Sequence, residues 1–367
     1  MTDNDRGLSL ASRIASVVWF LLGVGFLLSL PPLIELYAWI PLAILALAAV
    51  LAVPVAAVTR FVLDRARRKS FLAHWLKASV ALLLVLTTLA AAPLYYLAAI
   101  VQTDPLLAPQ VVLTNGKKTI LFQGMMHIGS DTFYKTAIYD LEHALNEGYV
   151  AYYEGVRPDP AGDVWFRDTL AGGGDLNAIY GSAGKACGLA FQGPYFQLLK
   201  TDIQDHPNRH VAADVTTLDL KTEYERMIAA DPKFADAIRQ AREADKKDAG
   251  IATEVAGFVR WAEDGTPGHR SIAGVLCRGV LTYALGDKHS RDKDDPMNRL
   301  ILDYRNRQLV ARIEADPRQK IYINYGAAHL PGLLAMLRQG DPNWKVVSEK
   351  WSRVVEPPED LQGRPLN

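Results

Sequence analysis

Three long apolar runs dominate the first third of the chain. Residues 14–34, 36–59 and 78–103 contain no charged side chain. Each run is long enough to cross the hydrocarbon core of a bilayer as a helix, which takes about 20 residues. None has the polar stripe at every 3.6 residues that a soluble helix shows. The pattern predicts three transmembrane helices; the alternative is two, with the first run lying partly in the membrane interface.

Charges between the runs predict the orientation of these helices. The segment from Arg60 to Lys77 holds six basic residues against the single Asp64, whereas the first connection offers only Glu35. Positive charge favours the cytoplasmic side, and Arg6 and Arg13 place the N-terminus there as well. We therefore expect residues 1–108 to anchor the chain in a lipid bilayer, the bacterial inner (cell) membrane, with the rest of the chain periplasmic or extracellular.

Beyond residue 108 the pattern changes to short apolar strands that alternate with longer helices. Asn115–Gly116 between two apolar runs is a strong hairpin signal. Asp131 is expected to cap a helix that ends near Asn146, and a later helix is expected to be capped by Asp214 or by Thr216–Thr217. The other expected strands lie at 149–153, 210–213, 320–324 and 344–347, and the other helices at 231–264, 272–285, 296–313 and 331–338.

This order predicts an α/β or α+β domain over residues 109–356, with a central mixed sheet and a helical insertion. The strand, helix and strand between 118 and 153 indicate a right-handed parallel crossover. Residues 357–367 carry Pro and Gly and are expected to form a disordered tail.

Composition narrows the function classes. The net charge is zero and the pI about 7.1, which excludes the basic face of a nucleic-acid binder. Only two cysteines are present, Cys187 and Cys277, so a disulfide-rich scaffold and a cysteine zinc finger are excluded. In an oxidising compartment these two cysteines would either pair or remain as buried thiols.

Two segments of the domain share one form. Residues 119–127 and 321–329 each run from an apolar strand through Gly and two small or soft residues to a histidine, His127 and His329. The strand at 149–153 ends in Glu154. Ligands of open α/β sheets bind beyond the carboxyl ends of strands. Two imidazoles and a carboxylate at such ends form the donor set of a catalytic metal site.

These motifs resemble the TraB/PrgY/TIKI superfamily, which includes the GumN-type proteins. The resemblance rests on Gly124-Met-Met-His127, Tyr153-Glu154-Gly155, Tyr304-Arg305-Asn306 and Tyr325-Gly-Ala-Ala-His329, and it covers about residues 111–348. It implies an α+β fold in which the paired motifs meet in one cleft. It also implies metal-dependent proteolysis with Mn²⁺ or Co²⁺ in some members, and haem-binding lipoproteins and erythromycin-esterase-like hydrolases among more distant relatives.

Each candidate residue has a chemical role and an alternative. His127, His329 and Glu154 would ligate a divalent metal (Mn, Co or Zn); without metal the histidines would act as a base and an orienting group, and Glu154 as general base. Arg305 would bind a substrate carboxylate or an oxyanion, or else pair with Glu154. The secondary candidates are Asn306, which would orient a ligand, and Asp214, whose alternative is the helix cap.

Two functions therefore compete. The first is a membrane-tethered, metal-dependent hydrolase, metalloprotease-like, that acts on a peptide or small-molecule substrate through the His/Glu/His cleft. The second is a non-catalytic binding or signalling protein that holds a peptide or haem in the same cleft.

Overall fold

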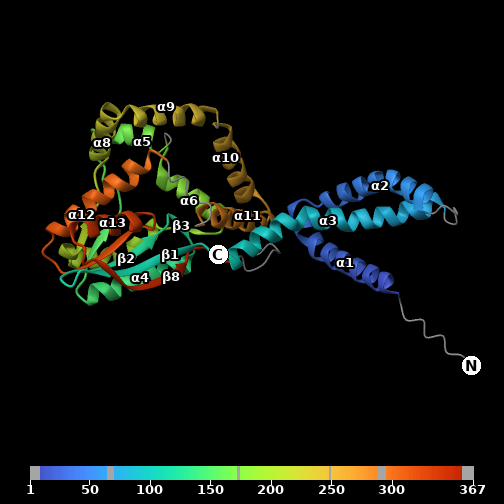
Figure 1. Cartoon of the computed structure of the whole chain (residues 1–367), viewed down its shortest axis with the longest axis horizontal. Helices are drawn as coiled ribbons and strands as arrows, with labels where there is room; N and C mark the ends of the chain where they lie inside the picture. Colours follow the sequence, from blue (N-terminus) through green and yellow to red (C-terminus); the bar gives the residue numbers. More distant parts are fainter. Residues whose placement is uncertain (1–8, 64–69, 172–173, 248, 287–294, 358–367) are drawn as a thin grey trace, which may run out of the picture. The chain divides into compact units, whose positions relative to one another are not determined.

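The computed structural model of the chain describes residues 9–63, 70–171, 174–247, 249–286 and 295–357 (Figure 1). The chain divides into two compact units. Among the described residues, the first comprises those within 9–99 and 264–276, and the second comprises those within 100–263 and 277–357. The first change between these units falls between Ala99 and Ile100, and the expected domain boundary at residue 108 stays a prediction.

The first unit contains three helices that are long and apolar enough to cross a membrane: α1 (Leu10–Leu36), α2 (Ile40–Val58) and α3 (Phe71–Thr103). Only 17% of the most apolar window of each helix is buried within the protein. So much exposed apolar surface is typical of helices that face lipid. The three expected spans are confirmed as helices of this kind.

The helix bounds differ from the expected runs, and the first helix, Leu10–Leu36, extends beyond its run at both ends. The second helix begins at Ile40 rather than at 36, with Pro41 in its first turn, where the missing N–H of proline costs nothing. The third begins at Phe71 rather than at 78. The third helix therefore includes Lys77 and extends beyond the uncharged run into residues with polar side chains.

A six-stranded mixed sheet forms the centre of the second unit, in the order β6-β4-β7-β2-β1-β8. Strand β1 pairs antiparallel with β2 and β8, whereas β2, β7, β4 and β6 pair parallel to one another. The strands are β1 (Leu107–Thr114), β2 (Thr119–Met125), β4 (Val150–Tyr153), β6 (His210–Ala212), β7 (Lys320–Gly326) and β8 (Lys345–Arg353). The expected mixed sheet is confirmed, and β8 is the expected edge strand, extended to nine residues.

Strand β7 lies between β4 and β2, although it follows both by more than 160 residues. The strand–helix–strand unit from β2 to β4 is thus parallel, as expected, but its two strands are not neighbours. The expected hairpin at Asn115–Gly116 joins β1 to β2. Gly116 has a φ of 85°, in the left-handed region that favours glycine.

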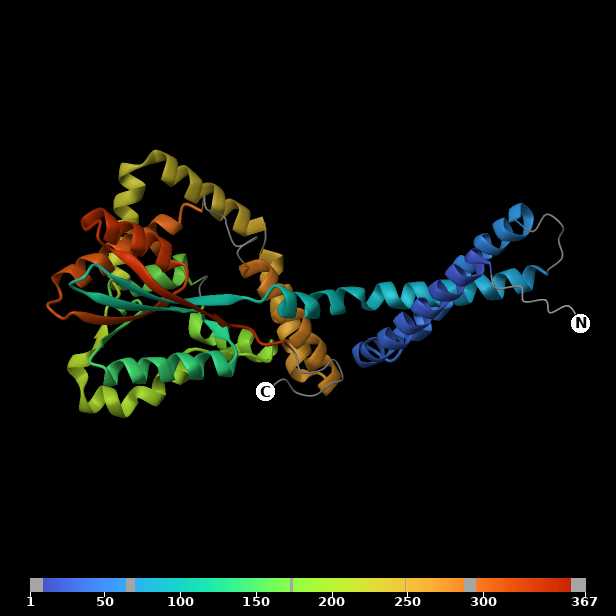
Figure 2. The same cartoon turned by 60° about the horizontal axis from the view of Figure 1, so that its bottom comes forward.

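Helices cover both faces of this sheet (Figures 1 and 2). Successive residues of a strand point to opposite faces. Ile321 and Ile323 of β7 pack with helices α12 (Arg305–Ala315) and α13 (His329–Gly340), whereas Tyr322 packs with α4 (Asp131–Asn146). The sheet is therefore buried on both sides in this region, which places the carboxyl ends of its parallel strands between helical layers.

The insertion between β4 and β7 is mainly helical, as expected. It contains α5 (Asp163–Thr169), α6 (Leu176–Ala186), α7 (Lys200–Asp205), α8 (Thr217–Ala230), α9 (Pro232–Lys247), α10 (Ala249–Asp264) and α11 (Pro267–Leu285), with the 3₁₀ turns Gly193–Leu199 and Pro207–Arg209 and the π-helical turn Arg299–Tyr304. A second, two-stranded sheet pairs β3 (Ile128–Gly129) with β5 (Ala190–Phe191).

Several expected helix starts are corrected. Ser130, not Asp131, caps α4, and Thr216 caps α8 in a capping box with Asp219, which excludes Asp214 from that role. Helix α13 begins at His329, two residues before the expected start. Cys187 and Cys277 form a disulfide within the second unit. The expected disordered tail falls on residues 358–367, apart from Pro357, and so lies outside the described residues.

Candidate functional site

The carboxyl ends of three adjacent parallel strands bring the main candidates together. His127 follows β2, His329 follows β7 and Glu154 follows β4. The register pairs Met125 with Gly326 across β2 and β7, so both Gly-x-x-His segments leave the sheet at the same edge. Glu154 and His329 approach within 3.5 Å, measured from Oε1 to Nε2. The two Gly-x-x-His segments, about 200 residues apart in the sequence, therefore follow neighbouring strands.

Glu154 accepts two hydrogen bonds at the end of β4, and Nε2 of His329 lies 3.5 Å from its Oε1. Its Oε1 accepts a hydrogen bond of 2.7 Å from Nη2 of Arg305, and its Oε2 accepts one from the backbone N–H of Gly326. Burial opposes ionisation of this carboxyl, but His329, Arg305 and the Gly326 N–H outweigh it and hold the pKa of Glu154 well below its usual range. Glu154 is therefore an ionised carboxylate at neutral pH.

His329 lies behind Glu154 and is fixed from its other side by Asn306. Nδ1 of His329 lies 2.8 Å from Oδ1 of Asn306, and Nδ2 of Asn306 donates to the His329 carbonyl at 3.2 Å. An amide oxygen only accepts, so Nδ1–H of His329 donates to Asn306, and a hydrogen bond from Nε2 to Glu154 requires that Nε2 carries a proton as well. A Cβ at Gly332 would lie 2.5 Å from Nδ2 of Asn306, so glycine leaves the space this amide occupies. With 2% of its surface exposed, His329 contacts Glu154 from within the protein.

Asp214 and Arg305 form a buried ion pair beneath Glu154. Nε of Arg305 donates to Oδ1 of Asp214 at 3.0 Å, and Nη2 donates to Oδ2. The backbone N–H groups of Gly155 and Val215 donate to the same carboxylate at 3.0 and 2.8 Å. Burial lowers the pKa of Arg305, but the two carboxylates outweigh it and raise the pKa above its ordinary value. The alternative role for Arg305, pairing with Glu154, is the one the structure has.

His127 occupies a different environment from His329. Its side chain is exposed, its ring stacks on Tyr180 with centroids 4.5 Å apart, and Nδ1 lies 2.9 Å from Nε2 of Gln192. Partial burial lowers the pKa of His127, Glu154 raises it and Arg305 lowers it further; the net direction is downward. His127 is therefore a neutral imidazole at neutral pH.

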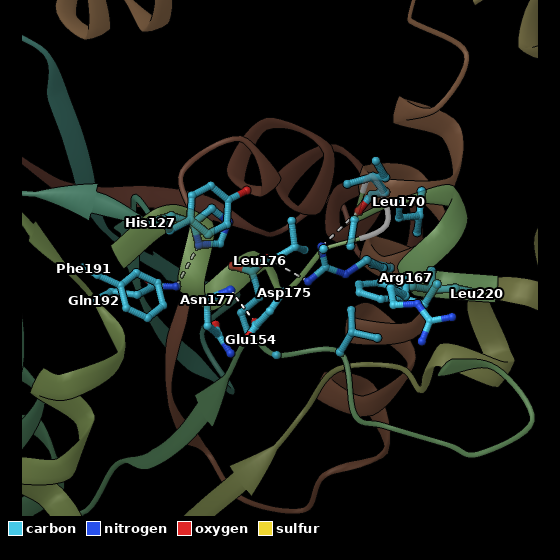
Figure 3. A pocket seen from close by; sticks show the side chains of 18 residues that line it. His127, Glu154, Arg167, Leu170, Asp175, Leu176, Asn177, Phe191, Gln192 and Leu220 are labelled. Carbon is cyan, nitrogen blue, oxygen red and sulfur yellow. Dashed lines mark hydrogen bonds and ion pairs between the residues drawn. The ribbon is translucent and has the colours of Figure 1, made fainter. Parts of the chain in front are cut away.

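A pocket of about 580 Å³ joins these groups. It is lined by His127, Glu154 and Arg305 together with residues from α5, α6 and β5. Figure 3 shows Glu154 near the middle of this pocket, with His127 and Gln192 on one side and Leu170 and Leu220 on the other. His329, Asn306 and Asp214 are not among the lining residues. They support the site from within the protein.

Gln192 and Tyr180 belong to the pocket but were not expected from the sequence. Gln192 follows β5, and β5 pairs with β3, the strand that starts directly after His127. These two strands have two residues each, which is too short to leave an alternating pattern. Tyr180 lies in α6, next to Gly181, in a segment for which the sequence predicted neither a helix nor a strand.

The arrangement does not form a metal site as it stands. Oε1 of Glu154 already accepts from the cationic Arg305, and Oε2 accepts from Gly326. A guanidinium beside the ligand oxygen opposes the binding of a second cation. In the part of the chain that the structure describes, no three His, Cys, Asp or Glu side chains are grouped to hold a metal. The expected divalent metal stays a prediction, and we route no chemical step through it.

Comparison of the chain with protein-family models, with curated proteins and with solved structures found no match.

Proposed function

We propose that this chain is a membrane-anchored hydrolase of peptide bonds that acts outside the cytoplasm. The observation that supports this most strongly is the ionised Glu154, held by Arg305, His329 and Gly326 at the wall of a pocket that it shares with the neutral His127. A fixed carboxylate and a neutral imidazole in one pocket can orient and deprotonate a water molecule. The motif resemblance to the TraB/PrgY/TIKI superfamily is part of the same proposal.

His127 is the better general base of the two. A base works best when its pKa lies near the operating pH, and the pKa of Glu154 lies far below it. The side-chain amide of Gln192 fits the same space when it is rotated by 180°, because its nitrogen and oxygen have nearly the same size and shape. In that orientation Nδ1–H of His127 donates to the amide oxygen, and Nε2 accepts the proton.

The reaction then balances with the groups of this chain. A water molecule that donates a hydrogen bond to Glu154 gives a proton to Nε2 of His127 while its oxygen bonds to the carbonyl carbon of the substrate. The C–N bond breaks, and the leaving amine takes that proton from His127, which returns to the neutral form. Glu154 stays ionised throughout, and His329 and Asn306 keep it in position.

Placement outside the cytoplasm is supported by two independent features. The basic segment between the second and third apolar helices favours the cytoplasmic side. If the third helix crosses the membrane, the unit that follows it lies on the opposite side. The disulfide between Cys187 and Cys277 is typical of proteins in oxidising compartments. A bacterial inner membrane with a periplasmic or extracellular catalytic unit fits both.

A non-catalytic ligand-binding protein is the competing function. It is favoured by the hydrogen bonds of Arg305. Its Nε and Nη2 donate to Asp214 and Glu154 and are therefore not available to a substrate. Such a protein would bind a peptide or haem in the pocket without turnover.

The test is a hydrolysis screen on the full chain in lipid nanodiscs, with internally quenched peptide libraries as substrates. We expect cleavage by the wild type that is lost in His127→Ala and retained in His206→Ala, a histidine outside the pocket. Parallel samples treated with EDTA, or loaded with Mn²⁺, Co²⁺ or Zn²⁺ and assayed for bound metal by mass spectrometry, test the metal prediction separately. Saturable peptide binding without any cleavage would favour the ligand-binding function instead.

A further inference from the structure

The end of the pocket opposite His127 is the open face of a hydrophobic cluster. Leu220 is only 2% exposed and belongs to a buried core with Val215, Leu300 and Phe234. Phe166 and Leu170 pack against that core while only partly buried, and both line the pocket. Apolar surface that remains accessible inside a pocket gains free energy when a ligand covers it.

This apolar end lies beside the proposed reaction centre and not apart from it. Figure 3 places Leu170 and Leu220 across the pocket from His127, with Glu154 between them. Ile301 also lines the pocket and lies four residues before Arg305. Its backbone carbonyl accepts a hydrogen bond of 3.4 Å from Nη1 of that arginine. One wall therefore carries both the charged group that holds Glu154 and the apolar surface next to it.

The segment that carries Phe166 and Leu170 is held firmly against α8. A Cβ at Gly162 would lie 2.3 Å from the backbone N of Leu218, so the entrance to α5 and the first turn of α8 are in direct contact. Thr217 donates through Oγ1 to Oδ1 of Asp163 at 2.7 Å. The Asp159 N–H donates to both side chains, at 2.9 Å each. The apolar end is thus built before any ligand arrives, which reduces the ordering that binding requires.

We propose that this apolar end, formed by Phe166, Leu170 and Leu220, binds an apolar side chain of the substrate next to the bond that is cleaved. The substrate class is then peptides with a residue of about the size of Leu or Phe at that position. This inference rests on the proposed hydrolase function for its catalytic meaning. An apolar pocket separates side chains that differ by a few methylenes by roughly 10- to 200-fold, so peptides with Leu or Phe should be cleaved at least tenfold faster than those with Ala.

The experiment that tests the site does not depend on turnover. In the full chain in nanodiscs, Leu170→Cys introduces a free thiol, because the native Cys187 and Cys277 form the disulfide. Its modification rates are measured with benzyl methanethiosulfonate and with the charged sulfonatoethyl reagent. The matched control is Val164→Cys in α5, the helix that ends directly before Leu170, at a position 59% exposed that does not line the pocket. The ratio of the two rates at Leu170→Cys is divided by the ratio at Val164→Cys, which removes the partition of the benzyl reagent into lipid.

We expect the normalised ratio of benzyl to sulfonatoethyl labelling to exceed 10. We also expect N-acetyl-phenylalaninamide, but not N-acetyl-aspartamide, to slow the labelling at Leu170→Cys. A normalised ratio near 1, with no protection by the apolar amide, overturns the inference. Preferential labelling in a protein that cleaves no peptide supports the apolar site and counts against the hydrolase. Cleavage by the wild type that is indifferent to Leu, Phe or Ala at every position leaves the hydrolase standing and overturns the inference.

Discussion

Asp214 and Arg305 show at the residue scale how a charged site persists inside this domain. Both side chains are nearly buried, at 2% and 8% exposure, and taking two charges out of water costs several kcal/mol per ion. Four donors from Arg305, Gly155 and Val215 compensate Asp214. The same guanidinium then holds Glu154, so the ionised state of the pocket carboxylate depends on an ion pair whose Asp214 does not line the pocket.

Removing Arg305 should destabilise the fold as well as the site. Arg305→Met leaves Asp214 buried without its cation, and we expect the free energy of unfolding to fall by about 3–5 kcal/mol, the usual cost of breaking such a pair. Denaturant unfolding of the full chain in detergent measures it. In Arg305→Met/Asp214→Asn the loss should be smaller than the sum of the two single losses. Additive losses would show that the pair is not coupled.

The lowered pKa of His127 predicts the acidic limb of the pH–rate profile. A base must be neutral to accept a proton, and the pKa of His127 lies below its ordinary 6.5. As the pH decreases from neutral, the kcat/KM of the wild type should therefore stay constant until about pH 6.5. Below that pH it should fall, as His127 becomes protonated. The residual activity of His127→Gln should lack that limb. A limb centred above 6.5, or one that survives in His127→Gln, contradicts the role of His127 as base.

At the scale of elements, the repeated strand–Gly–x–x–His form predicts β2, β7 and their common edge, because apolar strands and a following glycine leave a clear local pattern. The supports of the site were predicted less well. Asp214 was a secondary site candidate and one of two candidates for the helix cap, since Asp before a helix normally caps it; the other candidate, Thr216, caps α8 in the structure. Gln192 depends on the pairing of two very short strands, which no local pattern records.

Gly162 tests how the insertion is attached to the domain. Gly162→Ala would place a Cβ 2.3 Å from the backbone N of Leu218, so α5 must move away from α8. We expect a loss of about 1–3 kcal/mol in the free energy of unfolding, as for other overpacked sites. Gly181→Ala in α6 is the control, because nothing lies within 4 Å of its Cβ. There alanine should be neutral or stabilise the helix by about 1 kcal/mol. Equal stability of the two variants would contradict the tight contact.

For the whole molecule, three helices long and apolar enough to cross a membrane precede an α/β unit with a charged pocket. Length and hydrophobicity predicted the apolar helices and the sheet correctly, because both leave patterns in the chain that extend over many residues; the orientation expected from loop charge stays a prediction. The placement of Asp264–Leu276 in the first unit was not predicted. It depends on packing between helices distant in sequence, such as the hydrogen bond of 2.7 Å between His269 and the carbonyl of Leu36.

The proposed topology is tested by the accessibility of two introduced thiols. Thr201→Cys lies in α7 of the second unit and Ser70→Cys in the basic connection between α2 and α3, both at exposed positions. In intact bacterial cells expressing the full chain, a membrane-impermeant maleimide should label the first and not the second. Both should be labelled once the cells are opened. The reverse pattern would place the pocket in the cytoplasm.

The central claim is that Glu154 and His127 act together as the reactive groups of one pocket. Its most direct test is the kcat/KM for peptide hydrolysis by Glu154→Gln, a variant that keeps the size of the side chain and removes its charge. Asp140→Asn is the control, because Asp140 binds Gln110 and Lys350 away from the pocket. We predict a loss of roughly 10²- to 10⁴-fold for Glu154→Gln, the usual contribution of such groups, and less than threefold for Asp140→Asn. A Glu154→Gln variant that melts like the wild type and cleaves peptides at the wild-type rate would contradict the account.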